Sequence, residues 1–285
     1  MNYWARHISL AAIAVLLVGY AATTSANPVS ERGERTTTVG QETVQRAIET
    51  VNKLVGADGP TLVPAWLKAA PAGMTRPQAK DAVFVYLVQS APDSLKSPAS
   101  VPRRCRCIFV RPEVAKRWTE DNSKGTGRLQ LDEKNFLVFV LLHEVGHLAQ
   151  STRGVEFSEL DQSMLNTERN AMKKAEEEAD DFAAAVLRRT AKAATVSSTS
   201  LDANWVVNEL SKMSWNMQAF RTLDEFGAFS IGKPSVFFDG DYTHPNLALR
   251  VLRVNDLIHS TDETRYLLEA FKEARERGRK SQQAQ

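Results

Sequence analysis

The chain contains almost no cysteine. Its 285 residues include two, Cys105 and Cys107, so a framework of several disulfide bridges is excluded as the basis of the fold. Only one residue separates the pair, and a disulfide that closes so small a ring is strained and easily reduced. We therefore expect little stabilisation from these cysteines. A redox or metal-binding role for the pair stays open.

Neither sign of charge dominates the chain. Lysine and arginine number 36, against 34 aspartate and glutamate residues, which gives a formal net charge of +2 at pH 7. Such a nearly neutral balance argues against nucleic acid or an acidic surface as the main partner. The Lys/Arg-rich stretch 272–280 also contains glutamates, and we interpret it as the solvated end of a helix.

Long apolar runs are also scarce. One short run lies at Phe136–Leu142, and a longer one lies at Ile8–Ala22. It follows a positively charged start and precedes a small-residue site, so residues 1–26 are predicted to be a signal peptide. The alternative is an uncleaved anchor, although the run is shorter than the ~20 residues that span a bilayer. We expect an exported protein, periplasmic or secreted, with no transmembrane domain after this segment. Residues 27–40 form a polar linker, 41–277 one domain, and 278–285 a polar tail.

Apolar spacing predicts an α+β fold. Helical periodicity over 44–55 indicates a first helix. Runs rich in β-branched and aromatic residues predict strands at 82–88 and 107–110, with a shorter candidate at 127–131. The 107–110 run is the candidate edge strand for main-chain pairing with an extended peptide. Further helices are expected at 168–193, 203–226, 246–260 and 262–277. These elements together predict a small sheet that is followed by a mainly helical half.

The most informative feature is the H-E-x-x-H sequence from His143 to His147, which directly follows an apolar stretch. On a helix, residues i and i+4 lie on the same face, so the two imidazoles can bind one Zn²⁺ at about 2.0–2.1 Å. Glu144 lies at the edge of that face, where it can take a proton from a water molecule and pass it to a leaving amine. The alternative is a chance match. However, the stripe that includes Phe136 and Val140 turns both histidines inward, where an unpaired imidazole is costly.

A catalytic zinc site takes three protein ligands and leaves one position open, so a third ligand must follow the motif. The metzincin pattern is excluded, because its third histidine would fall at Arg153. On the next expected helix, Glu176 and Asp180 share the apolar face, whereas Glu178 lies on an intermediate face. Glu176 is therefore the first choice for the ligand and Glu178 the second. Asp180 can accept a hydrogen bond from a ligand imidazole and fix its tautomer.

Three motifs in order resemble the gluzincin peptidases of the CAAX prenyl endopeptidase family. They are the H-E-x-x-H sequence, the E-x-x-A-D-x-F-A sequence from Glu176 to Ala183, and the H-P-x-x-x-x-R sequence from His244 to Arg250. The resemblance covers about residues 136–255. It implies that Glu176 is the zinc ligand and that His244 and Arg250 lie near the active site, where they assist substrate or transition-state binding. The membrane-spanning helices of integral-membrane relatives are missing, so prenylated substrates do not follow from the resemblance.

The sequence therefore predicts a zinc metalloendopeptidase of the gluzincin type. We expect a zincin-like α+β fold, in which a small N-terminal sheet lies beside the H-E-x-x-H helix and a mainly helical half follows. One Zn²⁺ per chain would be held by His143, His147 and Glu176, with Glu144 as general base and a protein or peptide as substrate. Two alternatives remain open. One is a catalytically latent zinc protein that serves as a binding or chaperone-like module, and the other is a metal-dependent hydrolase that acts on bonds other than peptide bonds. The sequence does not predict the oligomeric state.

Overall fold

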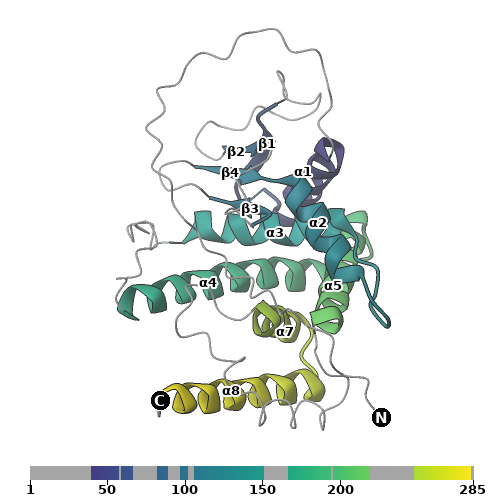
Figure 1. Ribbon diagram of the computed structural model, residues 1–285. Coiled ribbons are helices and arrows are strands. Elements are labelled where there is room, and N and C mark those ends of the chain that lie inside the picture. Colours follow the sequence, from purple (N-terminus) through teal and green to yellow (C-terminus); the bar gives the residue numbers. More distant parts are fainter. Residues whose placement is uncertain are drawn as a thin grey trace.

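A computed structural model describes residues 40–57, 59–66, 82–88, 97–101, 106–150, 166–193, 195–217 and 247–283. The predicted signal segment and most of the linker lie outside these residues. Within them the chain forms a small mixed sheet and a larger set of helices, which confirms the α+β class. Figure 1 shows the sheet at one end of the molecule, with helices stacked below it in successive layers.

The sheet has four strands in the order β1-β2-β4-β3. Strands β1 (Thr61–Pro64), β2 (Ala82–Leu87) and β4 (Cys107–Val110) are parallel to one another, and β3 (Ala99–Ser100) pairs antiparallel with β4. Because side chains alternate along a strand, Val83 and Val85 of β2 are fully buried, whereas Phe84 is exposed. The buried face of the sheet packs towards the helices.

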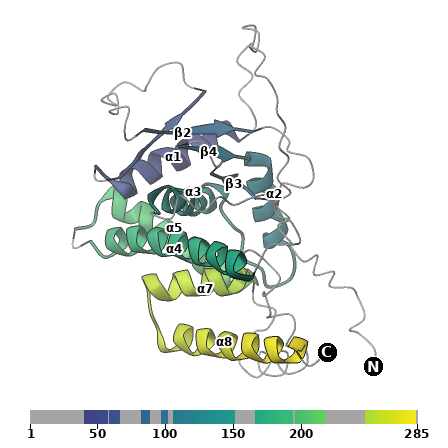
Figure 2. The same ribbon diagram turned by 90° about the vertical axis from the view of Figure 1, so that its left-hand side faces the viewer.

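Seven helices are described. They are α1 (Gln41–Val55), α2 (Pro112–Ser123), α3 (Glu133–Ala149), α4 (Asn166–Ala191), α5 (Ser198–Met217), α7 (Leu247–Ile258) and α8 (Asp262–Gln283). In both views α3 lies between the sheet and α4, with α7 beyond α4 and α8 beyond α7 (Figure 2). None of the described helices is long and apolar enough to cross a membrane.

Helix α3 is the centre of the main core. Asp132 directly precedes it as the N-cap, and its side chain accepts a hydrogen bond of 2.7 Å from the backbone N–H of Asn135. From Phe136 to Val145 every residue of α3 is buried, because the sheet side, α1, α4 and α5 all contact it. A helix that is buried on all sides places its polar residues in the interior, so those polar residues need specific partners.

Two sequence predictions about strands are wrong. The stretch 127–131 is not a strand, because its backbone pairs with a side chain instead: Asn216 of α5 accepts from the N–H of Leu129 and donates to its carbonyl, both at 2.8 Å. The run 107–110 is not an edge strand, since β4 lies between β2 and β3. The edge next to it is β3, which was not predicted.

Other elements differ in extent or were missed. Strand β1 was not predicted, because Pro64 disfavours a strand, but β1 is an edge strand, and an edge position tolerates proline. Helix α2 was not predicted, and it begins with Pro112 at its first position, where the missing N–H costs nothing. Helix α8 continues to Gln283, so most of the segment expected as a polar tail is helical.

Candidate metal centre

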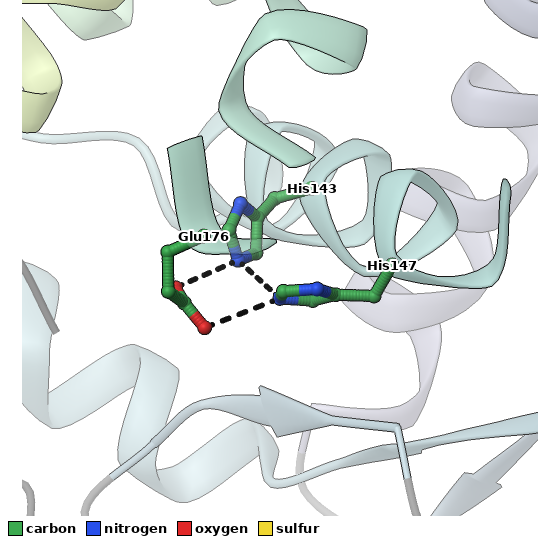
Figure 3. A group of neighbouring side chains, drawn as sticks. All are labelled: His143, His147 and Glu176. Atoms are coloured by element: carbon green, nitrogen blue, oxygen red, sulfur yellow. Dashed lines mark hydrogen bonds and ion pairs between the residues drawn. The ribbon is translucent and has the colours of Figure 1, made fainter. Parts of the chain in front are cut away.

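Two imidazoles of α3 face each other across one helical turn. His143 is 8% exposed and His147 is partly buried, and their Nε2 atoms lie 3.0 Å apart. Figure 3 shows both rings pointing to the same side of the helix. Two ring nitrogens this close can both ligate the same metal ion, as a pair of ligands at i and i+4 must do.

Glu176 of α4 completes a triangle with the two histidines. Its Oε2 atom lies 3.4 Å from Nε2 of His143, and its Oε1 atom lies 3.3 Å from Nε2 of His147 (Figure 3). Three ligand atoms at about 2.05 Å from one tetrahedral ion would be roughly 3.3 Å apart. The observed spacings of 3.0, 3.3 and 3.4 Å therefore fit a zinc ion with three protein ligands and one open position. These three residues form the one His/Cys/Asp/Glu group among the described residues that could hold a metal ion.

A glycine inside the motif lets α4 come this close to α3. A Cβ atom added at Gly146 would lie 2.8 Å from both the Cα and the carbonyl oxygen of Ala179. Carbon atoms in good contact are about 3.5–4.0 Å apart, so no side chain fits at this crossing. Because Ala179 stands between Glu176 and Asp180, the close approach at Gly146 sets how far these carboxylates reach towards the imidazoles.

Asp180 and Arg250 form the layer behind the triangle. Oδ1 of Asp180 lies 2.8 Å from Nδ1 of His143, so the carboxylate can accept the ring proton and leave Nε2 free for a metal. Arg250 of α7 donates through Nε and Nη2 to the two oxygens of Asp180, at 2.8 and 2.9 Å. Its Nη1 lies 2.9 Å from Oε2 of Glu176. One guanidinium therefore links both carboxylates of α4.

The pKa values of His143, Asp180 and Glu176 are strongly shifted. Burial lowers the pKa of His143, but the carboxylates of Asp180 and Glu176 outweigh burial and raise that pKa to about 10. Burial raises the pKa of Asp180, yet Arg250 and His143 bring it down to about 2. The pKa of Glu176 is held well below its usual range for the same reason, against the effect of burial. Both carboxylates therefore remain anionic, as ligation and proton acceptance require.

Glu144 follows His143 in α3 and is 6% exposed. Burial raises the pKa of its carboxyl group, whereas the imidazoles of His147 and His143 lower it. A carboxylate whose pKa is raised binds a proton more readily than a carboxylate in water does, which suits a group that takes and returns a proton.

Gln150 is a site residue that the sequence did not indicate. It follows the last residue of α3, and its Oε1 atom lies 3.4 Å from Nδ1 of His147. Its Nε2 donates to the carbonyl oxygen of Ala175, the residue before Glu176. Gln150 thus stands behind His147 as Asp180 stands behind His143. The spacing of three residues from His147 was the available signal, because i and i+3 share a helix face.

The remaining predicted residues are placed as follows. Glu178, the second choice for the ligand, pairs with Lys174 at 3.8 Å and points away from the triangle, with 38% of its side chain exposed. His244 and Cys105 lie outside the described residues. Cys107 begins β4, is 1% exposed and does not belong to the metal-binding group. It is disulfide-bonded.

Comparisons with known proteins give no counterpart: no family model, no curated protein and no solved structure matches the chain.

Proposed function

We propose that the chain is a zinc-dependent endopeptidase with a zincin-like arrangement of the gluzincin type. The observation that carries the proposal is the triangle of His143, His147 and Glu176, whose atom spacings fit one tetrahedral zinc ion. A chance H-E-x-x-H sequence gives no reason for a third ligand at the right distance on another helix. It also gives no reason for a hydrogen-bond partner behind each imidazole.

In the proposed mechanism the zinc ion, when bound, supplies Lewis-acid activation of a water molecule and of the scissile carbonyl group. His143, His147 and Glu176 would hold it, with Asp180 and Gln150 fixing the orientation of the two rings. Glu144 takes the proton of the attacking water and returns it to the leaving amine. Burial of the site keeps competing water away from these groups and strengthens their interactions.

Arg250 has a positioning role in this proposal. The resemblance implied that Arg250 and His244 assist substrate or transition-state binding. In the described structure the three guanidinium nitrogens of Arg250 all contact the carboxylates of Glu176 and Asp180. A buried guanidinium that neutralises two carboxylates keeps both groups ionised and in place. For His244 we propose a role in substrate or transition-state binding, and this proposal is supported by the family resemblance alone.

The chemistry of the site supports the proposed substrate class, and the sequence supports the proposed compartment. A general base beside a three-ligand zinc site suits hydrolysis of an amide bond, so a protein or peptide is the proposed substrate. The apolar segment near the start of the sequence supports export, to the periplasm or the medium. An anchor formed by the same segment would place the enzyme at a membrane instead.

The variant Glu144→Gln tests the function. It keeps the size of the side chain and all three ligands but removes the base, so zinc content should stay near one per chain while casein cleavage falls by about 10²–10⁴-fold. Glu178→Gln is the matched control, because Glu178 pairs with Lys174 away from the triangle. Chelator should abolish cleavage by the unmodified protein. Full cleavage by Glu144→Gln would refute the assignment, and zinc without any cleavage would favour a latent zinc protein.

A further inference from the structure

Exposed apolar side chains are concentrated around α5. Among the described residues, eight large hydrophobic side chains are exposed, and five of them lie on or beside this helix. Trp205 is 60% exposed and Leu201 is 51% exposed. The other three are Leu129, Val196 and Trp215, at 44%, 85% and 41%. Large side chains gathered in this way on one part of a surface mark an interaction site more often than scattered ones do.

The exposed large apolar side chains of α5 form a stripe on one helix face, together with Asn208 and the partly exposed Lys212. Positions 201, 205, 208, 212 and 215 follow one another at spacings of four and three, which keeps them on one side of the helix. The opposite side packs into the core through Ala203, Val206, Leu210 and Met213, each 0–1% exposed. Packing in the core therefore involves only one side of α5. It does not explain why Leu201, Trp205 and Trp215 lie on the other side. Positions 201 and 215 are 14 residues apart, so at 1.5 Å per residue the stripe is about 21 Å long.

The stripe has two fixed ends. At its C-terminal end, Nε1 of Trp215 donates to the carbonyl oxygen of Gly127 at 2.9 Å, and Asn216 holds the backbone of Leu129. These bonds place Leu129 beside Trp215. At the N-terminal end, Ser200 and Ser197 bond reciprocally, which fixes the turn that follows Val196. The apolar side chains are therefore presented by an ordered surface.

The charges along the stripe favour an anionic partner. Helix α5 has two acidic residues, and lysines pair with both. Asp202 lies 3.8 Å from Nζ of Lys53 and 3.6 Å from Nζ of Lys134, and its side chain is only 22% exposed. Glu209 is 2% exposed and lies 3.1 Å from Nζ of Lys212, which shares the stripe. Of these charged groups only Lys212 lies on the stripe, where it is more exposed than its partner Glu209, so the one charge of the stripe is positive.

We propose that this face of α5 docks on the surface of an anionic lipid bilayer, with Leu201, Trp205 and Trp215 in the interfacial region and Lys212 beside the headgroups. Tryptophan and lysine side chains are the residues that membrane interfaces favour, because each has an apolar body and a polar end. A partner helix fits less well, because Asn208 and Lys212 interrupt the stripe where a dry helix seam needs apolar residues. The inference does not depend on the metal site.

The way the chain enters the fold supports the same occupant. The apolar run Ile8–Ala22 precedes α1 in the sequence, and a polar segment joins the two. Helix α1 contacts α5, and Lys53 of α1 pairs with Asp202 of α5. If the run is retained as an anchor, which is the alternative to a cleaved signal peptide, it would connect to the helix that borders the stripe. A tether that leads into α1 and an interfacial face on the neighbouring helix α5 can bind the same bilayer. The tether then raises the effective concentration of the α5 face at the bilayer surface.

Quenching of tryptophan fluorescence by brominated phosphatidylcholine tests the proposal, in vesicles that also contain an anionic phospholipid. The full chain should be quenched, and the double variant Trp205→Phe, Trp215→Phe should lose most of the quenched signal. Trp118→Phe is the control and should retain it, because Trp118 stacks on Phe136 with ring centroids 4.4 Å apart. The vesicle affinity of Lys212→Gln should fall about fivefold, whereas that of Lys174→Gln on α4 should not change.

Two results would overturn the proposal. Equal quenching in the double variant and the unmodified chain would show that the contact is made elsewhere, for example by the Ile8–Ala22 run. Absence of quenching in the unmodified chain would show that no bilayer docks on the stripe, and a protein partner would then be the remaining occupant. Because Trp205 and Trp215 are exposed, phenylalanine at both positions should leave the circular dichroism spectrum unchanged, which separates a docking defect from misfolding.

Discussion

Gly146→Ala tests how the crossing of two helices builds the metal site. The added Cβ atom would lie 2.8 Å from Cα and from the carbonyl oxygen of Ala179. Contacts between carbon atoms are optimal at about 3.5–4.0 Å, so α4 must move away from α3 by roughly 0.7–1.2 Å. Glu176 is one turn from Ala179 and moves with the backbone. Zinc–oxygen bonds lie within about 2.0–2.2 Å, so a shift of this size removes a good third ligand.

The expected result is a large loss of zinc affinity with a small loss of stability. Displacement of a group that positions a ligand typically costs about 10–100-fold in metal affinity, and we expect the same range here. Overpacking costs about 1–3 kcal/mol, whereas alanine in place of glycine inside a helix gains about 0.8–1 kcal/mol. The free energy of unfolding of the metal-free variant should therefore fall by only about 0–2 kcal/mol.

The assay is a competition titration between the protein and a chromophoric zinc chelator, run beside urea unfolding in the presence of EDTA. A zinc affinity within twofold of the unmodified protein would refute the reasoning, because it would show that the reach of Glu176 does not depend on the contact at Gly146. A variant that no longer unfolds cooperatively would show instead that the clash is too large to be relieved by a small shift of α4.

Two further predictions concern the surroundings of the histidines. Gln150→Met removes the polar contacts to His147 and to Ala175 at nearly constant size, and it should weaken zinc binding by about 10-fold or more in the same titration. The same change at the exposed Gln130 is the control and should have no effect. In the metal-free protein the pKa of His143 is raised to about 10 from an ordinary 6.5, so the folded state binds a proton that the unfolded state releases. The contribution of His143 to the free energy of unfolding should therefore be fully present below about pH 6.5. It should fall by up to about 1.4 kcal/mol per pH unit as the pH rises towards 10. Urea unfolding in EDTA at pH 6.5, 8 and 9.5 measures this slope, and a flat profile would contradict the proximity of His143 to Asp180 and Glu176.

Periodicity and ligand chemistry predicted the parts of the site that depend on one element at a time. The apolar spacing in 44–55 predicted α1. The helical phase predicted that Glu176, and not Glu178, lies near the two imidazoles, as the structure has it. The reason is that a helix packed against α3 turns the polar residues of that side towards the imidazoles.

Features that depend on contacts between distant elements were not predictable in this way. Pro64 argues against a strand unless the strand lies at the edge of a sheet, and strand order is a property of the whole fold. The short strand β3 exists only because β4 provides a partner. The contact of Gln150 with Ala175 joins two helices, so neither helix alone gives a signal for it.

The most direct test of the central claim is the zinc content of the purified protein beside that of Glu176→Gln and Glu177→Gln. Glu176 contacts both imidazoles, whereas Glu177 lies on a different face of α4 and is not part of the metal-binding group. The account predicts about one zinc per chain in the unmodified protein and in Glu177→Gln, as expected for a single tetrahedral site, and a loss of most of it in Glu176→Gln. Equal zinc content in the two variants, or no zinc in the unmodified protein, would contradict it.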